Sequence, residues 1–238
     1  MRILIVGGAG RVGTWLTGAL RGAHQVTVLD RSIPQEGVPA DVHCREAPAT
    51  DTAALAEAVQ GQDLVVHLAG VTPRAGWADS PARIADAFAT NVGSLAATLE
   101  MCALHGVKRI VHISTVSVFH AFGESPVDPE GPSDSFEPYG LSKRTGEWIA
   151  RKYAEQRDLH VTSMRLVFPT ADEDAPAWRH PGDGSLRHPV LADGTAIPAT
   201  PASLIARHIV EASRWEGRYR AVVVAPTSNG LIRPPHLD

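Results

Sequence analysis

The chain has 238 residues, of which 44% are hydrophobic and 20% charged, enough for one well-cored soluble domain. A formal net charge of −4 gives no reason to expect nucleic acid or a membrane as a partner. The apolar runs are too short to cross a bilayer and no secretory signal is visible, so we expect a cytoplasmic protein. Cys44 and Cys102 lack metal-ligand spacing, so we expect reduced, buried thiols and no metal site.

Short apolar runs alternate with amphipathic stretches along the chain. Strands are expected over residues 2–6, 25–30, 63–69, 109–114, 160–167 and 220–225. Helices are expected over residues 11–21, 50–59, 81–105, 138–156 and 201–214. Between 168 and 200 the alternation breaks into Pro, Gly, Asp, Arg and His. Near-continuous apolar strands separated by helices predict an α/β fold with a doubly wound parallel sheet.

The stretch GGAGRVG lies between the first expected strand and the first expected helix. Its glycines, Gly7, Gly10 and Gly13, allow a tight turn, a close approach of the backbone to a pyrophosphate, and close packing of helix on strand. Arg11 and Val12 open the helix, where free N–H groups favour a phosphate. The pattern predicts a dinucleotide-binding loop, and a glycine-rich turn without a ligand is the alternative.

Asp30 closes the second expected strand, 17 residues after Gly13. A carboxylate there can accept hydrogen bonds from both hydroxyls of an adenosine ribose and would repel a 2′-phosphate. Asp30 therefore favours NAD over NADP as the cofactor, although the neighbouring Arg31 could soften that preference.

Tyr139 and Lys143 stand one helical turn apart in the stretch EPYGLSK. A tyrosine that acts as a base near pH 7 must lose roughly three units of pKa, or about 4 kcal/mol. A positive charge about 4–5 Å away supplies roughly 3–4 kcal/mol at an effective dielectric constant of about 20. The pair is therefore suited to proton transfer, and an ordinary pair on a helix surface is the alternative.

These motifs, with DLVVHLAG, NVGS, VKRIVHISTVSVF and PYGLSK in the same order, resemble the extended short-chain dehydrogenase/reductases, the NAD-dependent epimerase/dehydratase family. The resemblance covers residues 1–167 and implies a Rossmann domain there that binds NAD(P) and carries the catalytic residues. Residues 168–238 would form a small, partly irregular substrate-binding region.

The resemblance also implies roles for individual residues. Thr115 matches the catalytic hydroxyl, with Ser114 beside it. Tyr139 matches the catalytic tyrosine and Lys143 its partner, and both would also contact the cofactor. Asn91 matches the asparagine that supports the site from the long helix.

Two further expectations follow from the family. Leu68, Ala69 and Gly70 match the strand end that passes beside the cofactor. The helices over 81–105 and 138–156 often form a four-helix interface in this family, so we expect a homodimer.

The chain departs from the family pattern where large substrates are handled. Residues 114–119 lack the Asp-Glu pair of the dehydratases, which disfavours sugar 4,6-dehydration. The stretch after Arg165 lacks the Asn and Gly-Pro of nucleotide-sugar enzymes, and only about seventy residues follow it. The adenine-bracketing Asp-Leu falls near Pro48, and Asp63 is expected to cap a strand rather than replace it. The short tail is similar to that of the uronate dehydrogenases, which oxidise small sugar acids.

Candidate substrate-binding residues are Thr115, Ser117 and Arg179. Arg179 belongs to a basic cluster with His180, Arg187 and His188 that could bind a carboxylate or phosphate, or could be a solvated loop. We therefore predict an NAD-dependent oxidoreductase that acts on a small hydroxyl or carbonyl compound through a Thr-Tyr-Lys site. The alternatives are a sugar epimerase that retains its cofactor and a non-catalytic NAD(P)-binding sensor or scaffold.

Overall fold

The computed structural model describes residues 1–36, 38–71, 80–124, 127–128 and 131–226. Its centre is a seven-stranded sheet in the order β11-β6-β5-β4-β1-β2-β3, with every neighbouring pair parallel. The strands are β1 (Arg2–Val6), β2 (Gln25–Asp30), β3 (His43–Glu46), β4 (Leu64–His67), β5 (Arg109–Thr115), β6 (His160–Leu166) and β11 (Tyr219–Val224).

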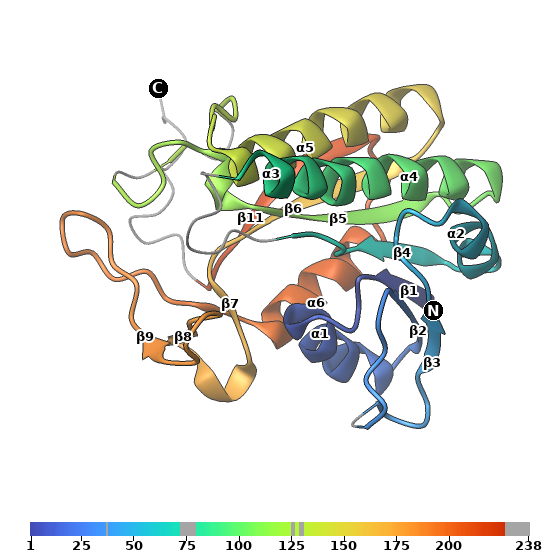
Figure 1. The fold of residues 1–238 in the computed structure, drawn as a ribbon, viewed down its shortest axis with the longest axis horizontal. Helices are drawn as coiled ribbons and strands as arrows, with labels where there is room; N and C mark the ends of the chain where they lie inside the picture. Colours follow the sequence, from blue (N-terminus) through green and yellow to red (C-terminus); the bar gives the residue numbers. More distant parts are fainter. Residues whose placement is uncertain (37, 72–79, 125–126, 129–130, 227–238) are drawn as a thin grey trace.

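Helices cover both faces of this sheet (Figure 1). One face carries α1 (Arg11–Arg21) and α6 (Ala202–Ala212). The other carries α2 (Thr52–Val59), α4 (Ser94–Leu104) and α5 (Pro138–Gln156). Alternate strand residues supply the two cores, because Ile3 and Ile5 pack towards α1 and α6 whereas Leu4 and Val6 pack towards the other helices. The predicted doubly wound parallel sheet is therefore confirmed.

One strand was missed and one cysteine was wrongly expected to be buried. β3 reads His-Cys-Arg-Glu and all four residues are exposed at the sheet edge, so it has no apolar run to reveal it. Cys44 lies in this strand and is exposed, whereas Cys102 is buried in α4.

The expected long helix is continuous but changes its winding. It consists of α3 (Pro81–Phe88), a π-helical turn η1 (Ala89–Gly93) and α4. By length and composition these 24 residues would be apolar enough to cross a membrane. In the fold, α4 instead contacts β4, α2 and α5, as the core helix of a globular protein does.

Asp51 is the N-cap of α2 and accepts from the N–H groups of Ala53 and Ala54.

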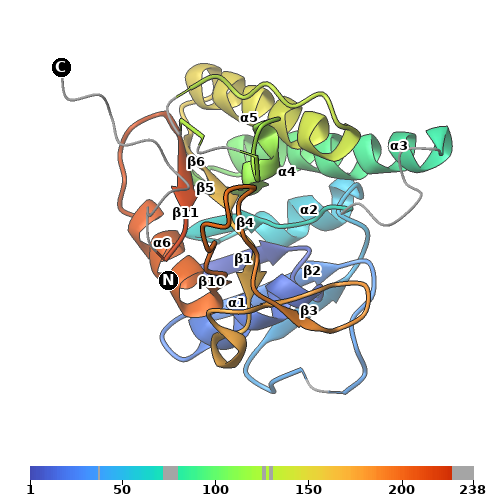
Figure 2. The same cartoon turned by 90° about the vertical axis from the view of Figure 1, so that its left-hand side faces the viewer.

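Beyond β6 the chain leaves the sheet and then returns to it. The short strands β7 (Pro169–Thr170), β8 (Trp178–Arg179), β9 (Leu186–Arg187) and β10 (Thr200–Pro201) form two small sheets. Figure 1 shows β8 and β9 to one side of the main sheet, and Figure 2 views the molecule from that side. α6 and β11 then rejoin the sheet. The domain boundary at residue 167 thus remains a prediction, and residues 227–238 of the expected substrate region lie outside the described residues.

Candidate active site

The candidate site lies at the carboxyl edge of the parallel strands, where ligands of open α/β sheets bind. The loop after β1, the ends of β2, β4 and β5, and the start of α5 all reach this edge. The 168–200 segment begins at the same edge, because it follows β6 directly.

The glycine loop has two positions that only glycine can fill. Gly7 has φ +86°, and a Cβ there would lie 2.4 Å from the backbone nitrogen of Ala69. At Gly13 a Cβ would lie 2.5 Å from the carbonyl oxygen of Gly8. A Cβ on Gly10 would meet no protein atom closer than 3.6 Å, and no side chain caps α1 at that residue. The start of α1 is therefore open to a ligand.

Asp30 is fixed against this loop. Its Oδ2 accepts a hydrogen bond of 3.0 Å from the N–H of Ala9. Arg11, the first residue of α1, reaches across to the 168–200 segment, where its guanidinium donates to the carbonyl oxygen of Arg179 at 3.1 Å. Arg11 also lies over the ring of Trp15. The loop and the later segment are therefore bonded to each other.

The strand end after β4 lies between the glycine loop and α5. The N–H groups of Leu68 and Ala69 both donate to the carbonyl oxygen of Val6 at 2.8 Å. A Cβ on Gly70 would lie 3.2 Å from Asn91 Oδ1 and 3.3 Å from Lys143 Nζ. The predicted cofactor strand end therefore passes directly against two predicted site residues.

Asn91 lies in the π-helical turn and is completely buried. Its Oδ1 accepts from the N–H of Val71 at 2.6 Å, and its Nδ2 donates to the carbonyl oxygen of the same residue at 3.2 Å. Nδ2 also donates to Ser142 Oγ at 2.9 Å. Asn91 thus ties the chain after β4 to the start of α5.

Thr115 and Tyr139 are brought together. Thr115 ends β5, and its hydroxyl shares a hydrogen bond with the hydroxyl of Tyr139 at the start of α5. Ser117 is next to them, with its Oγ 3.2 Å from Thr115 Oγ1. Proline at 138 starts α5 at this place, because proline is favoured in the first turn of a helix.

Lys143 follows Tyr139 by one turn and is only 4% exposed. Its Nζ donates to the carbonyl oxygen of Ile113 at 2.9 Å. Burial lowers the pKa of Lys143 to about 8, against a raising effect of the Glu147 carboxylate. The ammonium group is therefore close to neutralisation near physiological pH.

The pKa of Tyr139 is raised to about 12 by burial, and the bond from Thr115 opposes this only in part. From the spacing of the two residues, we expected Lys143 to lower the pKa of Tyr139. The difference arises because Lys143 is buried and Tyr139 is partly shielded from water, which disfavours the charged form of each. Tyr139 is consequently protonated in the unliganded protein.

Ser114 is not part of the Thr115–Tyr139 contact. Because successive strand residues face opposite sides, the Ser114 side chain lies on the face of the sheet that α5 covers, and its Oγ donates to Glu147 Oε1 at 2.7 Å. Glu147 in turn forms a buried ion pair with Arg165 of β6. No role for Glu147 was predicted from the sequence. Its position four residues after Lys143, on the same helix face, was the available signal.

The basic cluster in the 168–200 segment is largely paired within that segment. Arg179 donates from Nε to Asp174 Oδ2 at 2.8 Å and from a terminal nitrogen to the carbonyl oxygen of Gly184. Arg187 and His180 both contact Asp183. The guanidinium of Arg179, expected at the substrate, is thus held by Asp174.

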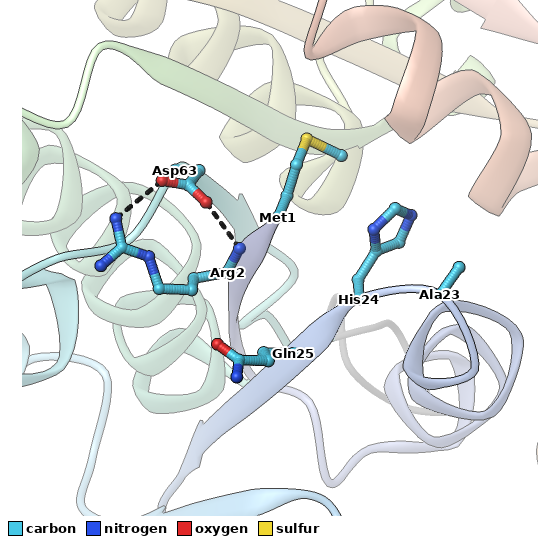
Figure 3. Close-up of a pocket in the computed structure, with 6 residues that line it drawn as sticks. All are labelled: Met1, Arg2, Ala23, His24, Gln25 and Asp63. Carbon is cyan, nitrogen blue, oxygen red and sulfur yellow. Dashed lines mark hydrogen bonds and ion pairs between the residues drawn. The ribbon is translucent and has the colours of Figure 1, made fainter.

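A separate hollow of about 520 Å³ lies at the opposite, amino edge of the sheet (Figure 3). Met1, Arg2, Ala23, His24, Gln25 and Asp63 line it. Asp63 accepts there from the backbone N–H of Arg2 at 2.7 Å and from its guanidinium at 2.9 Å. Asp63 therefore caps the amino end of β4 by bonding to Arg2 of β1, and it is remote from the glycine loop. Within the described ranges, no group of three His, Cys, Asp or Glu side chains could hold a metal ion.

Residues 3–173 match the model of the NAD dependent epimerase/dehydratase family. An L-arabinose 1-dehydrogenase (NAD(P)(+)) from Haloferax volcanii is 31% identical over 187 residues, which are 72% of this chain and 69% of that enzyme. A dTDP-glucose 4,6-dehydratase from Streptomyces niveus is 32% identical over 183 residues, which are 70% of this chain but only 53% of the relative.

Solved structures share the fold at lower identity. The UDP-glucose 4-epimerase from Brucella ovis, in complex with NAD, superimposes with a TM-score of 0.79 at 22% identity and covers 96% of this chain and 78% of its own. The uronate dehydrogenase from Agrobacterium tumefaciens gives a TM-score of 0.73 at 22% identity over 94% of this chain and 76% of its own.

Proposed function

This chain belongs to the NAD-dependent epimerase/dehydratase family, and from that premise we propose that it is an NAD-dependent oxidoreductase acting on a small hydroxyl or carbonyl compound. One observation carries the proposal. The Tyr139 hydroxyl, bonded to Thr115, and the buried Lys143 ammonium lie at the same sheet edge as the glycine loop and Asp30.

The cofactor site would be built from the two open features of the glycine loop. The uncapped start of α1, with the N–H groups of Arg11 and Val12, suits the pyrophosphate, and the open space over Gly10 admits it. Asp30 suits the adenosine ribose, since its carboxylate is held near the loop by Ala9 and would repel the 2′-phosphate of NADP.

NAD supplies a hydride acceptor when it is bound. Thr115 and Tyr139 would orient the substrate oxygen, and Tyr139 would hold the proton that this oxygen gains or loses. Burial keeps Tyr139 protonated, so a base needs the adjacent positive charge of Lys143. Lys143 would therefore supply the positive charge that makes a tyrosinate accessible.

The proposed substrate class rests on the names of the relatives and on the lack of carboxylates at residues 114–119. The arabinose dehydrogenase and a uronate dehydrogenase from Pseudomonas putida, 27% identical over 174 residues, are named for small sugars or sugar acids. The residues at 114–119 carry no carboxylate, which argues against dehydration. Ser117, beside Thr115, is a candidate contact to the substrate hydroxyls.

A homodimer through the helix layer formed by α3, α4 and α5 is part of the proposal. Trp148 on α5 is 62% exposed and Leu104 at the end of α4 is 64% exposed, so both helices present large apolar side chains outward. Burying such side chains would favour association of two copies across this layer.

A sugar epimerase that retains its cofactor is the second candidate. It is favoured by UDP-glucose 4-epimerases among the relatives, such as one from Azospirillum brasilense at 30% identity over 185 residues. That match covers 51% of the epimerase, so about half of that enzyme has no counterpart in it. Cofactor that stays bound through purification, with no net change in NADH during turnover, would favour this candidate.

The test is a panel of small sugars, sugar acids, alcohols and ketones followed by NADH absorbance with NAD and with NADP. Tyr139→Phe should lower the turnover rate of any active substrate by roughly 10²- to 10⁴-fold, because it removes the proton donor and acceptor. Tyr153→Phe, which changes another tyrosine of α5, is the matched control and should retain activity. A panel silent with both cofactors, in a protein that still binds NAD, would favour the non-catalytic alternative.

A further inference from the structure

Three consecutive residues at the end of β5, residues 113–115, are bonded to three different side chains of α5. The backbone carbonyl of the first accepts from Lys143 Nζ at 2.9 Å. The hydroxyl of the second donates to Glu147 Oε1 at 2.7 Å. The hydroxyl of the third shares a hydrogen bond with Tyr139. Glu147 is the one of these three helix residues that the proposed function leaves without a role.

The Glu147 carboxylate is held through both of its oxygens. Arg165 donates from Nε to Oε1 at 3.0 Å and from a terminal nitrogen to Oε2 at 2.7 Å. The two side chains are only 6% and 7% exposed, and Phe119 lies over the guanidinium at 4.7 Å. A buried ion pair often contributes no more to stability than apolar residues of the same size. Its presence one turn from Lys143 therefore points to a use other than stability.

The titratable groups that interact with Lys143 are Glu147 on its own helix, His67 on β4 and His112 on β5. Arg165 on β6 is bonded to Glu147. Burial and the Lys143 charge lower the pKa of His67 to about 3 and that of His112 well below its ordinary value, so both rings are neutral. Tyr219 on β11 lies near both members of the Glu147–Arg165 pair, and burial raises the pKa of Tyr219 to about 12. The Glu147 carboxylate is accordingly the group that favours a charged Lys143.

We propose that Glu147 is a positioning residue for the Tyr139–Lys143 pair: its carboxylate, fixed by Arg165, supplies the counter-charge of the buried ammonium and, through Ser114, anchors the strand end that carries Thr115. The inference rests on the proposed function of that pair. It assigns Glu147 no contact with substrate or cofactor.

The chain is well suited to a direct test, because it has only three lysines, Lys108, Lys143 and Lys152. Protein labelled with ¹³C at the lysine ε-carbon gives one signal for each, and Lys143→Arg identifies the signal of Lys143. In the unliganded wild type this signal should titrate near pH 8. In Glu147→Gln its midpoint should fall by roughly one pH unit or more, since an opposite charge nearby has been removed.

Two variants keep the test decisive. Glu147→Gln together with Arg165→Met leaves neither partner of the ion pair charged, so it serves if the single variant fails to fold, and it should show the same direction of shift. Glu155→Gln removes the exposed partner of Lys152 on the same helix and should leave the Lys143 midpoint in place. A Lys143 midpoint that stays within a few tenths of a pH unit in folded Glu147 variants overturns the proposal.

Kinetics separate this inference from the proposed function. On any active substrate, the rate deficit of Glu147→Gln should be greatest at pH values between the two Lys143 midpoints, because the variants differ in Lys143 charge only there. A purely structural role would lower the rate equally at all pH values and overturns the inference. A shifted midpoint in a protein that turns over nothing supports the electrostatic role of Glu147 and counts against the proposed function alone.

Discussion

Two arginine–carboxylate pairs in this molecule have the same separation and opposite surroundings. Arg165 and Glu147 are 2.7 Å apart and 7% and 6% exposed, within the layer between α5 and the sheet. Arg187 and Asp183 are also 2.7 Å apart, but 49% and 54% exposed in the 168–200 segment. If one partner of the exposed pair is removed, water solvates the charge that remains. If one partner of the interior pair is removed, the remaining charge is buried without solvent. Contact distance alone therefore does not tell what a pair contributes.

The same contrast separates the two parts of the candidate site. On the α5 side Lys143 is buried and Tyr139 is half-buried, and the pKa values of both depart far from ordinary values. In the 168–200 segment the pKa of Asp183 is lowered chiefly by hydrogen bonds from Ser185 while the side chain stays in water. The interior is thus where a substitution should change both stability and proton transfer.

Arg165→Met should give the largest loss of stability. It leaves the Glu147 carboxylate buried and without its cation, so we expect the free energy of unfolding to fall by about 3–5 kcal/mol. Urea denaturation measures this. Adding Glu147→Gln to the same chain should restore much of the loss, and a single-variant loss below about 1 kcal/mol would mean that the interior pair behaves like an exposed one.

Lys143→Met should have the opposite sign. Burial lowers the pKa of Lys143 from 10.5 to about 8, which at about 1.4 kcal/mol per pH unit corresponds to a cost of about 3 kcal/mol at pH 7. After the loss of the bond to Ile113, we expect a stabilisation of about 2 kcal/mol. The gain should shrink from pH 8 to pH 10.5, because the folded wild type is then neutral at Lys143 while the unfolded chain is still charged. A destabilised variant at pH 7 would contradict this account.

His67 should make the interior sensitive to acid. Its pKa is lowered from 6.5 to about 3, so below pH 6.5 protons bind the unfolded chain first and stability falls as the pH falls. Between pH 7 and pH 5 the loss due to His67 is about 2 kcal/mol. In His67→Gln, unfolding measured at both pH values should show a loss smaller by that amount. His105→Gln, at an exposed position, should leave the wild-type loss unchanged.

Arg187→Gln should have the smallest effect. The pair with Asp183 is exposed, so we expect the free energy of unfolding to change by less than about 0.5 kcal/mol. The same urea titration serves as the readout. A loss of 2 kcal/mol or more would show that this exposed pair contributes as much as an interior one, and the contrast between the two regions would fail.

The parts that could be predicted from sequence are those written in local spacing. The glycine loop, Asp30 and the Tyr139–Lys143 pair each lie within a short motif or at the end of an apolar run. The Glu147–Arg165 pair joins a helix to a strand 18 residues away, and a glutamate in a helix otherwise resembles a surface residue. The raised pKa of Tyr139 depends on burial, which no spacing reports.

The direction of the Asn91 side chain depends on the number of residues in the π-helical turn at 89–93. Removing one residue there would let the helix continue with ordinary winding and would leave α3 in place relative to α4, because a π-helical turn holds one residue more than an α-helical turn, but the side chains within the turn would change direction. Asn91 would then turn away from Val71 and Ser142 while the helix itself stayed intact. Insertions and deletions in this helix are therefore constrained far more tightly than substitutions on its outer face.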